Sequence, residues 1–234
     1  MARQKQLPPR LKALADWVPQ GAKVVDVGCD HGYLPVFLLQ NGQCDQVIAS
    51  DIREGPLRSA QNTATRYGLN DQIQFIQCDG LTGIAPDQVD TIVIAGMGGE
   101  TIIDILEYSP WTNQKTYRLL LQPMSKGELL RAFLYRNGYE IMDETLRWEP
   151  PFLYSALCVQ GGGEKRMPTP EERHVSAALK KKRDDLLKLY LERTVHWLSD
   201  VKRGLEQSKD PEAKERLSSI EQELTALQNI REEL

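Results

Sequence analysis

The sequence predicts an α/β fold with a mostly parallel sheet, followed by a C-terminal antiparallel coiled-coil hairpin. Up to residue 137, short apolar runs alternate with helical stretches, which is typical of parallel strands covered by helices on both faces. Two further β-prone runs follow without a helix between them, and they predict an antiparallel pair at one edge of the sheet. In the last third of the chain, apolar residues recur at alternating intervals of four and three, as in a coiled coil.

Each element of the sheet region follows from its local pattern. Leu11, Leu14 and Val18 share one face of the first expected helix because they lie three and four residues apart. Ser125 and Glu128 have the spacing of a capping box at the start of the last one. Helices are expected at residues 8–18, 34–41, 55–68, 99–108 and 126–137. Strands are expected at residues 23–28, 46–50, 73–77, 90–95 and 117–121, and the antiparallel pair at 139–147 and 152–160.

A glycine- and proline-rich stretch, GGGEKRMPTP at 161–170, predicts a linker between a domain at 1–160 and a helical hairpin at 171–234. Thr169 and Glu172 form a second capping-box pattern, and Asp210-Pro211 marks the start of the second helix. Because few residues separate the two helices, we expect them to pack as antiparallel neighbours. The apolar positions are Leu187, Leu191, Thr194, Leu198, Val201 and Leu205, then Ala213, Leu217, Ile220, Leu224 and Leu227.

Charge is distributed unevenly along the chain. The net charge of −4 excludes a uniformly basic nucleic-acid binder. Residues 165–203 nevertheless carry eleven basic and six acidic residues, whereas residues 204–234 carry four and eight. The first twenty residues add four basic residues, Arg3, Lys5, Arg10 and Lys12, against one acid. The acidic total therefore conceals basic surfaces, as expected of a selective polyanion binder.

The sequence shows no apolar run of bilayer-spanning length and no signal peptide, so we expect a cytoplasmic location and no membrane partner. The four cysteines, Cys29, Cys44, Cys78 and Cys158, have no ligand-like spacing with the three histidines. We therefore expect reduced thiols, with neither a metal site nor a disulfide framework.

The stretch VVDVGCDHGYLP, residues 24–35, predicts a ligand site at the end of the first strand. Gly28 lets the backbone approach a ligand closely, and Asp26 and Asp30 flank it. Two carboxylates would repel a diphosphate but attract the sulfonium and ammonium of S-adenosylmethionine (SAM). The alternative is a tight turn whose polar side chains only cap the next helix.

Two further acids follow strands. Asp51 ends the second strand, 23 residues after Gly28, where nucleotide-binding folds place a carboxylate on the ribose hydroxyls. Otherwise it caps the following helix. Asp79 and Gly80 follow the third strand within reach of an adenine amino group, although Asp-Gly is also a common turn signal.

The fourth strand runs into VIAGMGGET, residues 93–101. Its glycines could admit a flat substrate against the main chain, could cradle a phosphate, or could mark a crowded junction. Gln122 and Pro123 after the fifth strand are expected to face the same crevice. His31 is either a general base or a structural hydrogen-bonder, and Cys29 is expected to be unreactive.

Several motifs, in this order and spacing, resemble the bacterial tRNA (adenine-22-N1)-methyltransferases: DVGCDHGYLP, ASDIREGPLRSA, CDGL, VIAGMGGET and LQPM. The resemblance implies a Rossmann-like class I SAM-dependent domain of seven strands, with a C-terminal coiled coil and tRNA as substrate. The expected reaction transfers a methyl group from SAM to N1 of adenine 22. That nitrogen has an available lone pair, so alignment of the reactants matters more than removal of a proton.

The resemblance also implies roles for individual residues. It implies that SAM is held by Gly28, Asp30, His31, Asp51, Asp79 and Gly80, and we expect Asp26, Cys29 and Ile52 to complete the cofactor site. The acceptor base lies against Ala95, Gly96, Met97, Gly98 and Gly99, none of which can act as a base. Other substrate contacts are expected from Gln122, Pro123, Tyr154, Lys180, Lys181, Lys182 and Arg183. Tyr154, Met97 and Tyr33 could stack on the base, or could equally belong to the core.

Other functions remain open at the level of sequence. An NAD-dependent oxidoreductase predicts GxGxxG after the first strand, where this chain has GCDHGY. A SAM-dependent enzyme could act on another RNA or a small molecule. A SAM-binding protein without catalysis would use its hairpin to bind a partner, and the hairpin could also mediate dimerisation. No obligate protein partner is evident from the sequence.

Overall fold

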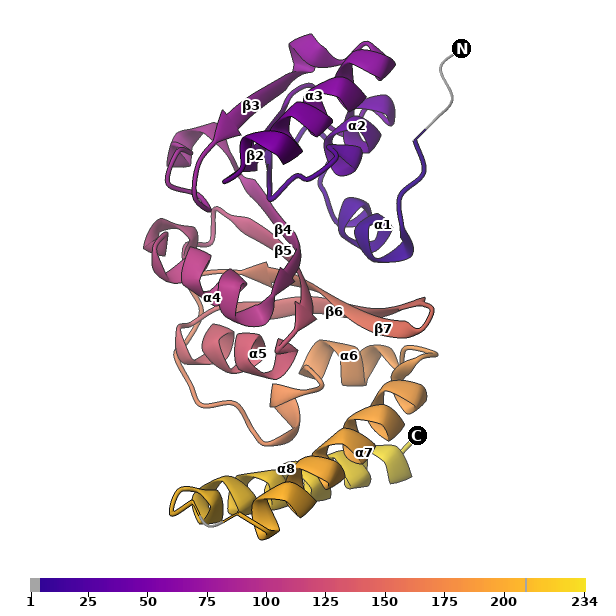
Figure 1. The fold of residues 1–234 in the computed structure, drawn as a ribbon, viewed down its shortest axis with the longest axis vertical. Coiled ribbons are helices and arrows are strands. Elements are labelled where there is room, and N and C mark those ends of the chain that lie inside the picture. Colours follow the sequence, from indigo (N-terminus) through magenta and orange to yellow (C-terminus); the bar gives the residue numbers. More distant parts are fainter. Residues whose placement is uncertain (1–4, 209) are drawn as a thin grey trace.

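The computed structural model describes residues 5–208 and 210–234, so that Arg3 of the predicted basic N-terminus lies outside the described residues. A seven-stranded sheet has the order β3-β2-β1-β4-β5-β7-β6, and β7 alone runs opposite to the other six strands (Figure 1). This confirms the mostly parallel Rossmann-like fold with an antiparallel pair at one edge. The strands are β1 Val24–Val27, β2 Val47–Asp51, β3 Ile73–Gln77, β4 Thr91–Gly98, β5 Arg118–Ser125, β6 Glu140–Glu149 and β7 Phe152–Gln160.

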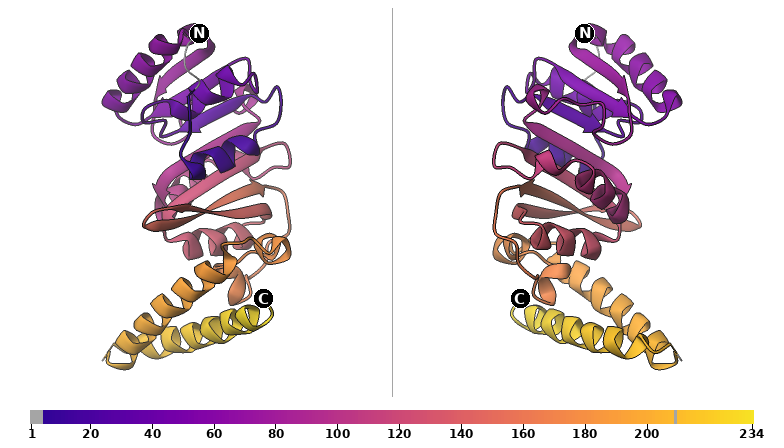
Figure 2. Two further views of the ribbon diagram at one scale, coloured as in Figure 1. Left: turned by 90° about the vertical axis from the view of Figure 1, so that its right-hand side faces the viewer. Right: turned by 90° about the vertical axis from the view of Figure 1, so that its left-hand side faces the viewer.

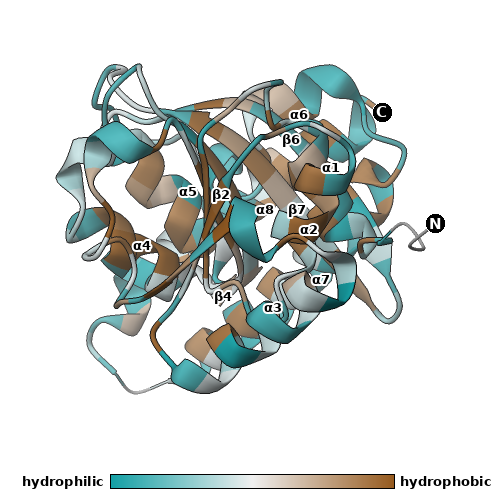
Figure 3. Cartoon of the chain, turned by 90° about the horizontal axis from the view of Figure 1, so that it is seen from above, coloured by the Kyte–Doolittle hydropathy of each residue, from teal (hydrophilic) through white to brown (hydrophobic). Residues whose placement is uncertain are grey.

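Helices cover both faces of the sheet. Those of the sheet region are α1 Pro9–Asp16, α2 Tyr33–Gln40, α3 Glu54–Tyr67, α4 Gly99–Glu107 and α5 Gly127–Arg136. Successive strand residues enter opposite apolar cores: Val24 packs with the cluster of α1, α2 and α3, whereas Val25 packs with that of α4 and α5. Hydrophobic residues accordingly concentrate on the strands and the inner helix faces (Figure 3).

The strand order reverses between β1 and β4, which lie side by side and parallel in the middle of the sheet. From β1 the chain proceeds outward to β2 and β3, and from β4 it proceeds in the other direction to β5. A crevice is expected at the carboxyl ends of such central strands, because the following loops diverge there.

The start of α5 differs from the expectation. The predicted capping box of Ser125 and Glu128 is wrong, because Ser125 is the last residue of β5 and pairs with Gly98 of β4. Lys126 occupies the N-cap position instead, in a left-handed conformation and without a side-chain cap. Strand pairing therefore determines this helix boundary.

The C-terminal helices α7 Leu187–Glu206 and α8 Ala213–Glu232 pack together as expected (Figures 1 and 2). An ion pair of 2.8 Å from Lys202 Nζ to Glu221 Oε1 joins them. The expected continuous helix from residue 171 is wrong, since that segment comprises a 3₁₀ turn, η4 Glu171–Arg173, and a short helix, α6 Ala177–Lys182. Arg183 in a left-handed conformation ends α6, so the Lys180–Arg183 cluster precedes the coiled coil.

A buried polar cluster connects the C-terminal region to the sheet. Arg131 of α5, 1% exposed, forms an ion pair with Glu144 of β6, 0% exposed. The same Glu144 carboxylate accepts a hydrogen bond from the amide of Ser176 at 3.2 Å, and Arg131 Nη2 donates to Ser155 Oγ at 3.1 Å. Leu146 extends this junction as part of an apolar cluster with C-terminal leucines.

A second polar link joins η4 to α8, where His174 Nε2 lies 2.7 Å from Glu223 Oε2 and both side chains are buried. Within the predicted linker, the Arg166 amide donates to the Tyr135 carbonyl of α5 at 3.0 Å. The division into 1–160, 161–170 and 171–234 remains a prediction.

In the described part of the chain, no helix is both long and apolar enough to cross a membrane.

Candidate active site

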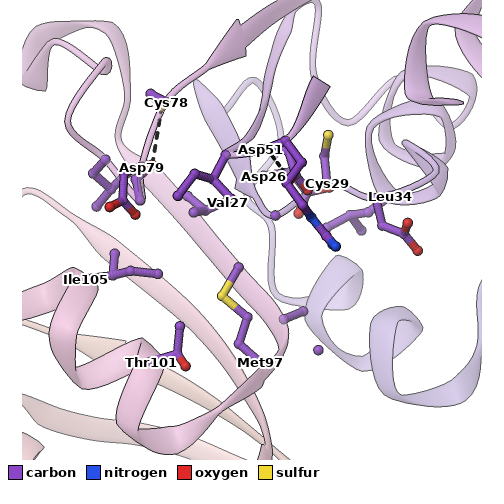
Figure 4. A pocket seen from close by; sticks show the side chains of 18 of the residues that line it. Asp26, Val27, Cys29, Leu34, Asp51, Cys78, Asp79, Met97, Thr101 and Ile105 are labelled. Atoms are coloured by element: carbon purple, nitrogen blue, oxygen red, sulfur yellow. Dashed lines mark hydrogen bonds between the residues drawn. The ribbon is translucent and has the colours of Figure 1, made fainter. Parts of the chain in front are cut away.

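A cavity of about 960 Å³ opens at the carboxyl ends of the parallel strands (Figure 4). This is near the upper end of the range of about 300–1,000 Å³ typical of small-molecule sites. Its walls come from the turns after β1, β2, β3 and β4, with α1 and α4 at the sides. Of the residues predicted from sequence, it brings together Asp26, Gly28, Cys29, Asp30, His31, Asp51, Ile52, Asp79, Gly80, Ala95, Gly96 and Met97.

The turn after β1 holds its shape through the backbone. The amides of Gly28 and Cys29 both donate to the carbonyl of Ser50, at 2.8 and 2.9 Å, which ties the turn to β2. Gly28 has a φ of +71°, and a Cβ there would stand 2.2 Å from the Met97 side chain. Glycine is favoured here because of this positive φ, whereas the nearby Met97 atom is the end of a flexible side chain that can move aside.

Five carboxylates line the cavity, those of Asp26, Asp30, Asp51, Asp79 and Asp104. Asp51 is buried, and its Oδ1 accepts a hydrogen bond of 3.0 Å from the Arg53 amide. Asp79 is exposed on the opposite wall (Figure 4). Asp26 is only 5% exposed, and burial, followed by the charges of Asp51 and Asp30, raises its pKa to about 7. A cationic ligand would relieve this repulsion.

The last four residues of β4, 95–98, form an irregular loop where the pairing with β5 shifts register, and the Met97 side chain lies in the cavity wall (Figure 4). Ala95, Gly96 and Met97 line the cavity, but Gly98 and Gly99 do not. Gly99 starts α4 and is buried, and a Cβ there would lie 2.3 Å from the Lys126 carbonyl oxygen. Gly99 is thus needed for close packing of two chain segments rather than for contact with a ligand.

Gln122 supports this loop from beneath. Its side chain is fully buried, and Oε1 accepts a hydrogen bond of 3.2 Å from the Gly96 amide. Pro123 is also buried, and neither residue lines the cavity. The expectation that both face the crevice is therefore corrected, and from this part of β5 it is Met124 that lines the cavity.

His31 and Cys29 have partners that favour structural roles. His31 Nδ1 lies 2.6 Å from Ser59 Oγ, and Nε2 lies 3.6 Å from Asp30 Oδ2. Its ring stacks on Tyr33 with centroids 5.2 Å apart. Burial, followed by the charges of Asp26 and Asp51, raises the pKa of the Cys29 thiol, so that the thiolate is disfavoured.

The remaining predicted substrate residues lie outside the cavity. Tyr154 belongs to β7, and the guanidinium of Arg10 lies 5.7 Å from its ring centroid. Lys180 and Lys182 on α6 form ion pairs with Glu233 and Asp143 at 3.0 and 3.2 Å. Lys181 and Arg183 are exposed beside them. A tRNA that contacts these residues would do so through a part other than the base that enters the cavity.

Sequence reasoning missed two parts of the cavity wall. Thr101, Asp104, Ile105 and Tyr108 line it from α4. Their spacing of three, one and three residues marks one face of a helix, and that signal could have identified them. Arg10 lines it from α1 and forms an ion pair with Glu149 of β6; no local pattern identifies a contact between residues so far apart in the chain.

Comparison with known proteins connects this geometry to a family. Residues 7–157 match the family described as methyltransferase domain. The chain belongs to this methyltransferase family. In sequence, it is 37% identical over 157 residues to the tRNA (adenine(22)-N(1))-methyltransferase of Bacillus subtilis, covering 67% of this chain and 66% of that protein, just under two thirds of its length.

Solved structures extend the likeness over nearly the whole chain. The B. subtilis m1A22 tRNA methyltransferase TrmK superposes with a TM-score of 0.86 and 28% identity, covering 97% of this chain and 100% of that one. Streptococcus pneumoniae Sp1610 in complex with S-adenosyl-L-methionine gives a TM-score of 0.78 and 30% identity, with the same coverage. The resemblance indicated by the sequence motifs is confirmed.

Proposed function

We propose that this chain is a tRNA methyltransferase that transfers the methyl group of SAM to N1 of adenine 22. The observation that carries the proposal is that one cavity joins an acid-lined wall to the end of β4, Ala95 to Met97, which carries no charged side chain. The first suits a cation with a ribose, and the second suits a flat base. Membership of the methyltransferase family favours this function over the NAD-dependent oxidoreductase.

The cavity residues fit SAM. Asp51 would accept hydrogen bonds from the ribose hydroxyls, and Asp79 would lie near the adenine amino group. Asp26 and the Gly28 turn would hold the methionine end of SAM. The sulfonium supplies the methyl group, which N1 of the target adenine receives with its lone pair. The product base is cationic and no proton is lost. The protein therefore orients the reactants and surrounds the transferred positive charge with carboxylates.

The test is incubation of the protein with SAM and unmodified bacterial tRNA, followed by nucleoside mass spectrometry. We expect 1-methyladenosine, mapping to position 22. If SAM binds but no methylated nucleoside forms, the tRNA proposal is overturned and a small-molecule acceptor or a non-catalytic SAM-binding protein takes its place.

Binding of SAM is expected to release a proton from Asp26. In the free protein this buried carboxyl has a pKa raised to about 7, and a neighbouring cation lowers that pKa because it stabilises the carboxylate. SAM affinity should therefore rise about tenfold between pH 6 and pH 8. Calorimetry in buffers of different ionisation enthalpy measures the released proton.

Asp26→Asn provides the control for this pH dependence. The variant keeps the shape of the side chain but cannot titrate, so only the titration of the ligand itself should remain. Equal proton release by wild type and variant would show that another group is responsible.

Reversal of Lys180, Lys181 and Lys182 to glutamate should flatten the salt dependence of tRNA binding. Each lost phosphate contact reduces the slope of log affinity against log salt by about 0.7–0.9. Lys214→Glu with Arg216→Glu, exposed on α8, is the control and should leave the slope unchanged. An unchanged slope in the α6 variant would show that this cluster does not contact tRNA phosphates.

The cytoplasmic location expected from the sequence remains a prediction.

A further inference from the structure

The hairpin of β6 and β7 extends beyond the rest of the sheet. β5 pairs with β7 only at Leu157–Gln160, whereas β6 continues to pair with β7 as far as Phe152. Residues 147–154, here called the hairpin tip, therefore form a two-stranded arm between α1 and α6 (Figure 1). Because β7 runs antiparallel to β5, the tip lies at the edge where the parallel strands end and the cavity opens.

The hairpin tip exposes aromatic rings on both of its faces. Phe152 is 57% exposed and Trp148 is 36% exposed. Phe152 and Tyr154 lie on one face, with ring centroids 5.8 Å apart, and Trp148 lies on the other, since adjacent strand residues alternate. Exposed rings at the end of a hairpin are typical of an interaction surface rather than of a core.

Arginines surround these rings. Arg193 of α7 lies 4.6 Å from the Trp148 ring centroid and donates to the Pro151 carbonyl at 3.1 Å. Arg10 lies over Tyr154, and its amide donates to Glu149 Oε1 at 2.8 Å. Glu149 is the one carboxylate in residues 147–154, and Arg147 adds a third guanidinium. Aromatic faces beside guanidinium groups suit bases linked by phosphates.

Arg10 also connects the hairpin tip with the cavity, because it lines the cavity wall while it contacts Glu149 and Tyr154. A nucleotide next to a base that enters the cavity would thus reach the tip. We propose that the hairpin tip is a stacking surface for unpaired tRNA nucleotides adjacent to the target adenine, with Phe152 as the principal exposed ring. This inference rests on the proposed function.

The test compares tRNA affinity, by gel shift, for wild type, Phe152→Leu and Phe152→Trp. Loss of the ring in Phe152→Leu should weaken tRNA binding about tenfold, and Phe152→Trp should restore it, because stacking requires a flat π-face. SAM affinity and thermal stability should remain those of wild type. Met142→Ala, on β6 and similarly exposed at 54%, is the matched control and should bind tRNA normally.

Two outcomes would overturn the inference. One is equal tRNA affinity of wild type and Phe152→Leu. The other is a change of oligomeric state in Phe152→Leu by sedimentation, which would make the tip a contact with a second copy of the chain. Failure of the wild type to methylate tRNA would instead overturn the proposed function. The gel shift measures tRNA binding without methyl transfer, so the two failures can be told apart.

Discussion

Arg131→Met is expected to destabilise the protein by about 3–5 kcal/mol, because it leaves the buried carboxylate of Glu144 without its partner. Both side chains are almost completely excluded from solvent. Glu144 retains the Ser176 amide as a donor, but one neutral donor does not compensate a buried charge. Urea unfolding followed by circular dichroism measures the change in the free energy of unfolding.

A double variant and a surface variant make the result specific. Arg131→Met with Glu144→Met should recover much of the lost stability, since no charge then remains buried. Arg58→Met, which removes an exposed ion pair with Glu54, should cost less than about 1 kcal/mol. If Arg131→Met were no more destabilising than Arg58→Met, the buried pair would not stabilise the junction between α5, β6 and the C-terminal region.

Asp51→Ala is expected to weaken SAM binding by about 10- to 150-fold, which corresponds to the loss of about 1.5–3 kcal/mol from charged hydrogen bonds. The carboxylate is already positioned by the Arg53 amide, so little ordering is needed when the ribose binds. Asp51→Asn retains an acceptor for that amide and isolates the contribution of the charge.

The control is Asp71→Ala, at an exposed carboxylate in the 3₁₀ turn η1 Asn70–Gln72 that does not line the cavity. It should leave SAM affinity unchanged in isothermal titration calorimetry. Unaltered SAM affinity in Asp51→Ala, with an intact circular dichroism spectrum, would show that the ribose does not bind at the end of β2.

Most of the fold was predictable because central strands such as β1 and β2 are buried on both faces and read as apolar runs, while the partly exposed edge strand β3 keeps β-prone residues. β1, β2 and β3 lie within one residue or two of the expected positions. The pattern could not show that β7 inserts between β5 and β6, because both of these strands offer an edge to it. The break at Arg183 was missed since α6 and α7 share a polar, helix-favouring sequence, and tertiary contacts determine where α6 ends.

The candidate site was predictable where a motif directly follows a strand. Asp51 and Asp79 lie in the cavity because parallel strands end at a common edge. Gln122 also follows this rule in sequence, but its side chain lies below the loop and bonds to Gly96. The alternation of side chains along β5 did not show whether Gln122 lies in the cavity or beneath the loop. The place of Arg10 in the cavity wall could not be predicted, because it depends on where α1 packs against the sheet.

The junction at Glu144 and Ser176 also determines what can be exchanged between related proteins. A C-terminal helical pair attached by a flexible tether could be transplanted onto another catalytic domain with little adjustment. Here Leu146 packs with Val175, Leu179 and Leu187, and the Arg131–Glu144 pair lies beneath them. A functional chimera that takes its C-terminal helices from a relative would therefore need to take α5 and β6 from the same source.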